Sequence, residues 1–314
     1  MEYETALKNY ENQQEEIQHH KRFIDRFRAS AARAASVQSR IKMLNAMERF
    51  QKPEKPFTLE FEFPQCSHVS GDVISLRNVT FGYNSKEILL NGISQNIGLD
   101  SRIGVIGANG AGKSTLISLM LEQLKPIKGD VVRNRKARIA VFTQHHIDQL
   151  DLSMSPMDFL LAKFADDCRS LIYLFIVIIL SNNNKQYIYN IEEKRPAEYI
   201  RNKLGAFGLS GEIVNQRMVF LSGGQKSRVA FTILTWEIPH FIIMDEPTNH
   251  LDMETIDALI GAIHKWNGGI LVVSHDQHFL MSAAKKFWSL SIKSGTIEEF
   301  VDLGKAKDFA SHRA

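Results

Sequence analysis

The chain has 314 residues, with 38 lysines and arginines against 35 aspartates and glutamates, so its net charge is +3. At 44% hydrophobic and 23% charged residues it has the composition of an ordinary folded protein, which excludes collagen-like, mucin-like and acidic disordered classes. The excess charge lies in residues 1–56, which hold 11 basic and 8 acidic side chains, whereas residues 57–314 hold 27 of each. Within that segment, residues 21–52 hold nine basic and two acidic side chains. Positive charge is therefore local.

Cysteines and hydropathy indicate the compartment. Cys66 and Cys168 form no Cys-x-x-Cys pair, which indicates a reducing compartment and no structural zinc. The N-terminal sequence MEYETALKNYENQQ is too polar for a secretory signal. The longest apolar run, residues 171–180, would span about 15 Å as a helix, half of a roughly 30 Å hydrocarbon core. We expect a cytoplasmic protein without membrane insertion.

Residues 1–56 are predicted to form a basic helical hairpin. Residues 2–50 contain no glycine or proline and are rich in strong helix formers. Two apolar stripes follow helical spacing, Tyr3, Tyr10, Ile17 and Ile24 in the first and Val37, Ile41, Leu44 and Met47 in the second. We expect two antiparallel helices, the alternative being one long solvated helix. The basic residues expected near the bend are Arg22, Arg26, Arg28 and Arg33.

Residues 57–314 have the pattern of a layered α/β domain, in which short apolar runs alternate with helical stretches. Phe57, Leu59, Phe61 and Phe63 alternate with polar neighbours, which predicts a strand. Further strands are predicted at residues 73–81, 102–106, 241–244 and 270–273. The last three are apolar on both faces, as in buried parallel strands.

Residues 171–191, LIYLFIVIILSNNNKQYIYNI, fit nothing around them. They have no Gly, Pro, Ala or acidic residue, and 15 of these 21 residues are Ile, Phe, Tyr, Asn or Lys, whose codons are rich in A and T. We interpret the stretch as an anomalous insertion, a retained intron translated in frame. The alternative is a genuine surface insertion, and sequencing the transcript distinguishes the two.

Residues 107–114, GANGAGKS, match the phosphate-binding pattern G-x-x-x-x-G-K-[ST] between a predicted strand and a predicted helix. The glycines allow backbone N–H groups to surround phosphate oxygens at a helix N-terminus. Lys113 would neutralise the β- and γ-phosphates, and the Ser114 hydroxyl would ligate Mg²⁺. The nucleotide-binding residues expected here are Gly107, Ala108, Asn109, Gly110, Ala111, Gly112, Lys113, Ser114 and Thr115.

Residues 241–247, FIIMDEP, place two carboxylates at the end of a buried strand. Open α/β sheets bind ligands at the carboxyl ends of their strands, so this pair is predicted to face the phosphate loop. Asp245 suits a Mg²⁺ contact, and Glu246 suits the general base that polarises attacking water. His275, after another apolar strand, could hydrogen-bond the γ-phosphate, the alternative being a purely structural histidine. Residues 221–225, LSGGQ, precede a helical run and offer a second helix N-terminus to a phosphate.

Taken in order, the phosphate loop, LSGGQ, MDEP, TNHLD and SHD resemble the nucleotide-binding domain of ABC ATPases over residues 70–302. The resemblance implies an α/β P-loop NTPase fold with a helical subdomain, ATP and Mg²⁺ as cofactors, and ATP hydrolysis. It implies that Tyr83 stacks on adenine, that Gln144 is a catalytic residue and Mg²⁺ contact, and that Asp252 belongs to the D-loop. It also implies nucleotide contacts for the LSGGQ segment, at Ser222, Gly223, Gly224 and Gln225. A metal site at the adjacent His145 and His146 is not expected, because adjacent side chains point apart.

TNHLD after MDEP, together with a basic hairpin, resembles the ABC-F family, whose members lack transmembrane partners and act on ribosomes. Residues 22–44 resemble the helical linker between the two ATPase domains of that family. QHHIDQLDLS and IRNKLGAFGLSGE resemble the second domain of its eukaryotic translational-control branch. With one phosphate loop, one LSGGQ and one MDEP, the chain looks like a C-terminal half, residues 1–56 being the linker and residues 57–314 the nucleotide-binding domain.

The resemblance also implies partners. In ABC ATPases each nucleotide lies between the phosphate loop of one domain and the LSGGQ of the other, so this chain is expected to need a second ABC domain. That domain is either the missing N-terminal half or a second copy. The hairpin is expected to bind ribosomal RNA or tRNA in a salt-dependent manner. Two alternatives stay open, an ATPase subunit of an ABC transporter and a catalytically incomplete fragment acting as a scaffold.

Overall fold

The computed structural model describes residues 2–29, 33–52, 59–84, 87–165, 194–249 and 251–312. The chain divides into two compact units, Met1–Thr58 and Leu59–Ala314, each of which is described by itself. The anomalous stretch 171–191 and Cys168 lie outside the described residues. Within the described ranges, no helix combines the length and the hydropathy that a membrane span requires.

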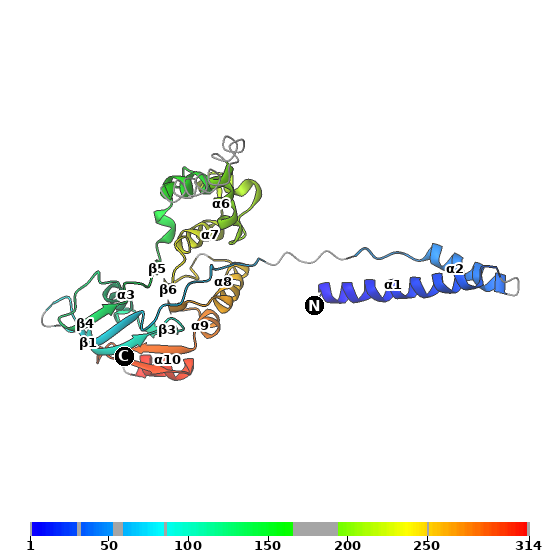
Figure 1. Cartoon of the computed structure of the whole chain (residues 1–314). Coiled ribbons are helices and arrows are strands. Elements are labelled where there is room, and N and C mark those ends of the chain that lie inside the picture. Colours follow the sequence, from blue (N-terminus) through cyan, green and yellow to red (C-terminus); the bar gives the residue numbers. More distant parts are fainter. Residues whose placement is uncertain are drawn as a thin grey trace. The chain divides into compact units, whose positions relative to one another are not determined.

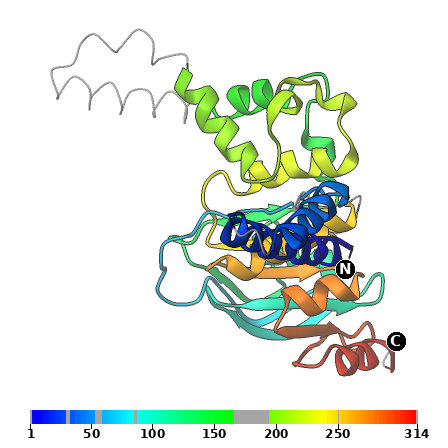
Figure 2. The same ribbon diagram turned by 90° about the vertical axis from the view of Figure 1, so that its right-hand side faces the viewer.

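The first unit is a helical hairpin of α1 (Glu2–Phe27) and α2 (Ala34–Ala46), which lie side by side (Figures 1 and 2). The Arg33 guanidinium lies 4.1 Å from the centroid of the Phe27 ring, near the bend. Further from the bend, the Arg40 guanidinium lies 3.7 Å from the centroid of the Phe23 ring. Because later positions of α2 meet earlier positions of α1, the helices are antiparallel. The predicted hairpin is confirmed, and the single long helix is excluded.

A buried glutamine holds the chain against α1 after α2 ends. Gln13 is 9% exposed; its Nε2 donates to the Glu48 carbonyl at 2.8 Å, and its Oε1 accepts from the Phe50 N–H at 2.8 Å. The side-chain amide therefore satisfies two backbone groups of an extended segment that has no sheet partner. This contact extends the hairpin beyond the 13 residues of α2.

The second unit is built on two sheets (Figure 1). Strands β1 (Ile74–Phe81), β2 (Leu90–Ile97) and β4 (Lys128–Arg133) form an antiparallel sheet in the order β2-β1-β4. The second sheet has the order β5-β6-β7-β3-β8-β9. Its strands are β3 (Arg102–Gly107), β5 (Ile139–Phe142), β6 (Phe241–Asp245), β7 (Gly269–Val273), β8 (Lys286–Leu290) and β9 (Ile297–Phe300). All neighbours in it are parallel except β8 and β9, so the three predicted buried parallel strands are confirmed.

Some helices of this unit pack on the two sheets, and others form a helical subdomain. The helices of the described part are α3 (Lys113–Met120), α4 (Pro156–Lys163), α6 (Lys194–Gly205), α7 (Gly223–Leu234), α8 (Met253–Lys265), α9 (Gln277–Ala283) and α10 (Leu303–His312), with 3-10 turns η2 (His146–Gln149), η4 (Gly211–Asn215) and η5 (Met218–Phe220). In Figures 1 and 2, α6 lies at the opposite end of this unit from α10. The fold is the expected P-loop NTPase fold with a helical subdomain.

Three apolar clusters hold this unit together. One lies between the antiparallel sheet, α3 and the parallel strands; it includes Leu76, Leu116 and Trp288. A second contains residues of α8, α9 and α10 with residues of the parallel strands. The third belongs to the helical subdomain, formed by α4, α6, η4, η5 and α7. Helix α7 contributes to the last two, with Phe231 in the second cluster and Val229 in the third.

The strand predicted around Phe57–Phe63 is wrong as a sheet element, and Phe57 itself lies outside the described residues. Residues 59–69, here called the strap, run extended without strand pairing. Leu59, Phe61 and Phe63 are each less than 10% exposed, so the alternation does bury one face. That face packs on aromatic rings, with Phe61 5.4 Å from Phe207 and Phe63 5.7 Å from Trp266 between ring centroids. Burial of every second residue shows that one face of the segment is covered, and the covering element need not be a neighbouring strand.

Candidate functional site

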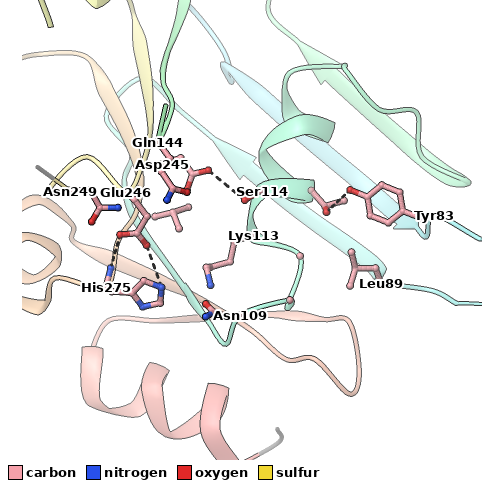
Figure 3. A pocket seen from close by; sticks show the side chains of 14 residues that line it. Tyr83, Leu89, Asn109, Lys113, Ser114, Gln144, Asp245, Glu246, Asn249 and His275 are labelled. Carbon is pink, nitrogen blue, oxygen red and sulfur yellow. Dashed lines mark hydrogen bonds and ion pairs between the residues drawn. The ribbon is translucent and has the colours of Figure 1, made fainter. Parts of the chain in front are cut away.

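A cavity of about 620 Å³ lies at the carboxyl ends of the parallel strands β3, β6 and β7 (Figure 3). Most of the nucleotide-site residues expected from the sequence line it, brought together from six separate segments. The lining residues are Tyr83, Leu89, Asn109, Gly110, Gly112, Lys113, Ser114, Thr115, Gln144, Asp245, Glu246, Asn249, Val273 and His275. This is the edge of the sheet at which open α/β folds bind ligands.

The phosphate loop joins β3 to α3 with two glycines in left-handed conformations, Gly110 at φ 83° and Gly112 at φ 98°. The positive φ of Gly112 favours glycine, and an added Cβ there would also lie 3.2 Å from side-chain atoms of Leu89 and Leu90, which would have to shift slightly. The Lys113 ammonium donates to the carbonyls of Gly107 at 2.7 Å and Ala108 at 3.2 Å. These contacts hold the lysine across the loop.

Three predicted phosphate-loop residues form the frame of the loop and do not line the cavity. Gly107 and Ala108 contribute the carbonyls that hold Lys113. Ala111 is 1% exposed, and its N–H donates to the Ala108 carbonyl at 3.1 Å. Their role in shaping the loop is structural, and the nucleotide contacts assigned to them stay predictions.

Asp245 and Glu246 reach the cavity from the end of β6. The Ser114 hydroxyl lies 3.5 Å from Asp245 Oδ2, so the first helical turn of α3 and the strand end face each other. Glu246 has a φ of 51°, unusual for a residue with a side chain. Its N–H donates to the Val273 carbonyl of β7 at 2.8 Å, which helps to hold this conformation. Such strain occurs preferentially where a side chain must be aimed at a ligand.

His275 and Glu246, which both line the cavity, form a pair (Figure 3). The backbone N–H of His275 donates to Glu246 Oε2 at 3.3 Å, and the imidazole Nε2 lies 3.4 Å from Oε1. Oε1 is buried and has no hydrogen-bond partner with good geometry among the described residues. A buried carboxylate oxygen without a well-formed hydrogen bond is uncommon in a folded protein, and a functional role is one explanation for it.

Burial shapes the protonation of the charged groups. Desolvation raises the pKa of Asp245, and the Ser114 hydroxyl and the Lys113 charge oppose this rise. Desolvation also raises the pKa of Glu246, and the nearby His275 opposes it most. Burial lowers the pKa of Lys113, while Glu246 and Asp245 raise it. The Lys113 ammonium and the Glu246 carboxylate are thus held near each other in a partly dehydrated site.

The donor set suits Mg²⁺. The Ser114 hydroxyl, the Asp245 carboxylate and the Gln144 side-chain amide all line the same cavity. These are oxygen ligands, which hard divalent cations prefer, and the 3.5 Å between Ser114 Oγ and Asp245 Oδ2 is short enough for one ion to contact both residues. The residues present therefore fit a magnesium ion that is also bound by phosphate oxygens.

The opposite end of the cavity is apolar and aromatic. Tyr83 is 69% exposed, and its hydroxyl lies 3.1 Å from the Thr115 hydroxyl. Its ring packs edge-on against Phe81, with the centroids 5.2 Å apart. Leu89 lies on the same side (Figure 3). An exposed aromatic ring with an apolar neighbour is suited to stacking on a flat base.

Leu89, Asn249 and Val273 were missed as lining residues. Asn249 belongs to TNHLD and Val273 ends a predicted strand, so motif position pointed to both. Leu89 carries no such signal, because it reaches the cavity through the packing of β2 beside Gly112.

The LSGGQ segment and Asp252 do not line the cavity but lie against each other. Ser222 caps α7 through a capping box with Gln225, and Asp252 caps α8 by accepting from the Thr255 N–H at 2.8 Å. A Cβ added at Gly224 would lie 3.1 Å from Asp252 Oδ2, which measures how closely the two helix starts approach. The predicted residues therefore fall into two groups within one chain.

An arginine beside the LSGGQ segment and Asp252 was not assigned a role from the sequence. Arg228 of α7 donates to the Thr255 hydroxyl at 3.1 Å and lies 4.0 Å from Asp252. Its Nε is buried without a hydrogen-bond partner among the described residues. These contacts fix the start of α7 to the start of α8. The signal for it was its position three residues after LSGGQ.

Two family models match the chain. A model described as ABC transporter matches residues 90–249, and a second with the same description matches residues 1–63. Protein GCN20 of Saccharomyces cerevisiae is 40% identical over 296 residues, which is 94% of this chain and 35% of that protein. ATP-binding cassette sub-family F member 3 of Homo sapiens is 39% identical over 282 residues, which is 90% of this chain and 36% of that protein. The chain thus spans little more than a third of the length of these relatives.

Solved structures show the same fold. The ATP-binding cassette MJ0796, a dimer in a post-hydrolysis state bound to ADP and Pi, has a TM-score of 0.55 at 21% identity and covers 73% of this chain and 98% of its own. The cassette cbiO1 of Clostridium perfringens, part of an ABC transporter complex, has a TM-score of 0.54 at 21% identity and covers 78% of this chain and 93% of its own. At such identities the likeness concerns the fold alone.

Proposed function

Because the chain belongs to the ABC-F family of ABC ATPases, we propose that it binds and hydrolyses ATP with Mg²⁺ as a module that acts in translation on the ribosome. The observation that carries the nucleotide part is the cavity that brings Lys113, Ser114, Asp245 and Glu246 together. The relatives named for sub-family F and the basic hairpin support the ribosomal part.

The proposed binding mode follows the geometry of the cavity. Lys113 neutralises phosphate charge, and its present carbonyl partners are weaker than a phosphate would be. Ser114 and Asp245 hold Mg²⁺ together with Gln144, and that ion when bound would withdraw charge from the phosphates. Tyr83 and Leu89 receive the base at the far end. All the residues given these roles line the same cavity, so one bound nucleotide could contact them together.

Glu246 is proposed to act as the general base. Burial raises the pKa of its carboxylate, which makes it a stronger proton acceptor than an exposed glutamate. The Oε1 atom lacks a well-formed hydrogen bond, so no strong donor would compete with an attacking water that Oε1 orients and from which it takes a proton. His275, 3.4 Å from that oxygen, would hold the water or the γ-phosphate in place.

Hydrolysis is proposed to require a second ABC domain in head-to-tail pairing. The LSGGQ segment and Asp252 lie outside the cavity that holds Lys113, so within this chain they do not complete it. A helix N-terminus such as that of α7 is a ready site for a phosphate, which a facing domain would supply. That domain is a second copy of this chain or another ATP-binding cassette.

The hairpin is proposed to bind ribosomal RNA or tRNA. Arg22, Arg26 and Arg28 are exposed near the bend, and Arg33 stacks on Phe27 there. Guanidinium groups that stack on rings keep their N–H edges available for phosphate oxygens. Each phosphate neutralised releases counterions, so binding should weaken steeply with salt.

Sedimentation with ribosomes tests the ribosomal part. The chain, alone and paired with a second ABC domain, is sedimented with ribosomes at rising salt, beside a variant with Arg22, Arg26 and Arg28 changed to Gln. We expect association at low salt, and a salt slope reduced in the variant by about 0.7–0.9 per lost phosphate contact. A matched variant with the exposed Lys285, Lys293 and Lys305 changed to Gln loses the same charge and should keep the slope. No association of the paired protein at low salt overturns the ribosomal part, and co-fractionation with membranes favours a transporter role.

A further inference from the structure

A buried hydrogen bond joins the cavity side of the ATPase domain to the helix that presents LSGGQ. His146 Nε2 lies 2.9 Å from Ser227 Oγ, and the two residues are 4% and 0% exposed. His146 begins η2, two residues after the cavity-lining Gln144. Ser227 lies in the first turns of α7, which begins at Gly223. The contact therefore connects the two groups of site residues within one chain.

The neighbours of His146 assign a direction to this hydrogen bond in the neutral imidazole. His146 Nδ1 lies 3.1 Å from the Thr143 carbonyl, which only accepts, so Nδ1 carries the hydrogen. In the neutral imidazole Nε2 then accepts, and the Ser227 hydroxyl donates to it. The ring also stacks on Phe142 with centroids 4.0 Å apart, and Phe142 stacks on Phe231 of α7 at 4.6 Å. The position of His146 is thus set by β5, by η2 and by α7.

Ser227 extends the connection to the first residue of α7. Its hydroxyl oxygen lies 3.1 Å from the Gly223 carbonyl as well as 2.9 Å from His146. The hydroxyl has one hydrogen for these two acceptors, so the orientation of this group depends on the positions of both η2 and the first residue of α7. Gln144 lies two residues before His146 along the backbone, and from His146 the hydrogen-bonded route runs through Ser227 to the glycine that follows Ser222.

We propose that His146 and Ser227 are positioning residues that couple nucleotide occupancy of the cavity to the placement of the LSGGQ segment in the same chain. Neither side chain lines the cavity, so both act through Gln144 on one side and Gly223 on the other. The inference rests on the proposed function, because only a paired domain would use the LSGGQ segment. In such a pair, this connection would report the occupancy of one nucleotide site to the other.

Hydrogen exchange on the full chain, with and without ATP and Mg²⁺, tests this coupling without requiring turnover. Ser227→Ala removes the hydroxyl, and His146→Phe keeps a ring against Phe142 but removes both hydrogen bonds. Thr232→Val is the matched control, because Thr232 lies buried on the same helix and donates to the Arg228 carbonyl at 3.0 Å within α7. Lys113→Ala serves as the variant that should not bind nucleotide.

In the wild type and in Thr232→Val, ATP should slow exchange of the amides at residues 222–228 by about fivefold, the factor that one net hydrogen bond contributes. Ser227→Ala and His146→Phe should bind ATP within about twofold of the wild type, since a net hydrogen bond remote from the ligand is all they lose. They should nevertheless lose the slowing, and the double variant should behave as either single variant does.

The outcomes separate this inference from the proposed function. If the wild type binds no ATP, the proposed function fails. If it binds ATP but residues 222–228 do not respond, or if they respond equally in Ser227→Ala and His146→Phe, the coupling through these residues is overturned. Equal loss of response in Thr232→Val would assign the effect to general loosening of α7 and would also overturn it.

Discussion

Glu246→Gln is expected to stop ATP turnover while preserving nucleotide binding. Glutamine has the shape of glutamate, and its amide oxygen can still accept from the His275 N–H, which lies 3.3 Å from Oε2. The backbone contact from the Glu246 N–H to the Val273 carbonyl at 2.8 Å is unaffected by the change. The cavity should therefore keep its form, and the substitution removes only a proton acceptor and a negative charge.

The size of the effect follows from these two losses. General base catalysis contributes about 10²–10⁴ in rate, which corresponds to about 3–5 kcal/mol of transition-state stabilisation. Burial raises the pKa of Glu246, so the base is well matched to its task and the upper half of that range is expected. Loss of a negative charge beside the phosphate site should leave ATP affinity equal or slightly higher.

Phosphate release at saturating ATP and Mg²⁺ measures the turnover, with the chain titrated upward and with a second ABC domain added. Equilibrium binding of ATP measures the affinity in parallel. Asp245→Asn is the comparison, because a Mg²⁺ ligand should affect both quantities. Turnover within about threefold of the wild type would remove Glu246 from the role of base, whose loss should cost at least a hundredfold. Loss of binding in Glu246→Gln would make it a binding residue instead.

Three further perturbations test the reasoning at other positions. Because His275 lowers the pKa of Glu246, His275→Gln should raise that pKa. The acid limb of the pH profile of turnover, where Glu246 loses its proton, should then move to higher pH. An unshifted acid limb would contradict the pairing of His275 with Glu246. Gly112→Ala should weaken ATP binding and lower the free energy of unfolding by about 1–3 kcal/mol, because alanine is strained at φ 98° and its Cβ would crowd two neighbouring leucines. Calorimetry measures the free energy of unfolding, and ATP titration measures the affinity. Phe61→Ala should lower the free energy of unfolding of the ATPase unit by about 3–5 kcal/mol, as a buried ring is lost, and denaturant titration would contradict the strap packing if the loss were below about 1 kcal/mol. Glu60→Ala, which removes an exposed ion pair of the same segment, should cost less than about 1 kcal/mol and is its control.

The sequence was sufficient for the parts of the fold that local patterns determine. Strands apolar on both faces were placed within a residue or so, because their burial is written into consecutive positions: β6 spans Phe241–Asp245 and β7 spans Gly269–Val273. The phosphate loop was located from the glycines of its motif, two of which have the left-handed backbone conformation that favours glycine. The order of the parallel strands in the sheet could not be predicted from local patterns. It depends on contacts between residues more than 100 positions apart, such as the pairs of β5 with β6.

Side chains positioned by tertiary packing escaped prediction. His145 and His146 are adjacent, yet His145 is exposed and lies 3.3 Å from Asp148, whereas His146 is buried against Ser227. Part of this difference comes from Ser227 of α7, which lies 81 residues after His146 along the chain. Leu89 was missed for the same reason, and the strap was taken for a strand because alternation does not identify the surface that covers it.

Helix α7 is the element on which the separate parts of this domain depend. Its residues belong to two apolar clusters. Phe231 belongs to the cluster that α8, α9 and α10 form with the parallel strands, and Val229 belongs to the cluster of the helical subdomain. Ser227 ties its beginning to η2, and Arg228 ties it to α8. A helix held by two cores and two polar contacts cannot move at one end without disturbing the others, because closely packed interfaces shift between discrete arrangements and do not deform continuously. Nucleotide-dependent changes at Gln144 are therefore expected to move the LSGGQ segment together with α7 as a body. Variants of α7 should uncouple the two nucleotide sites of a pair more strongly than equally conservative variants in the parallel sheet.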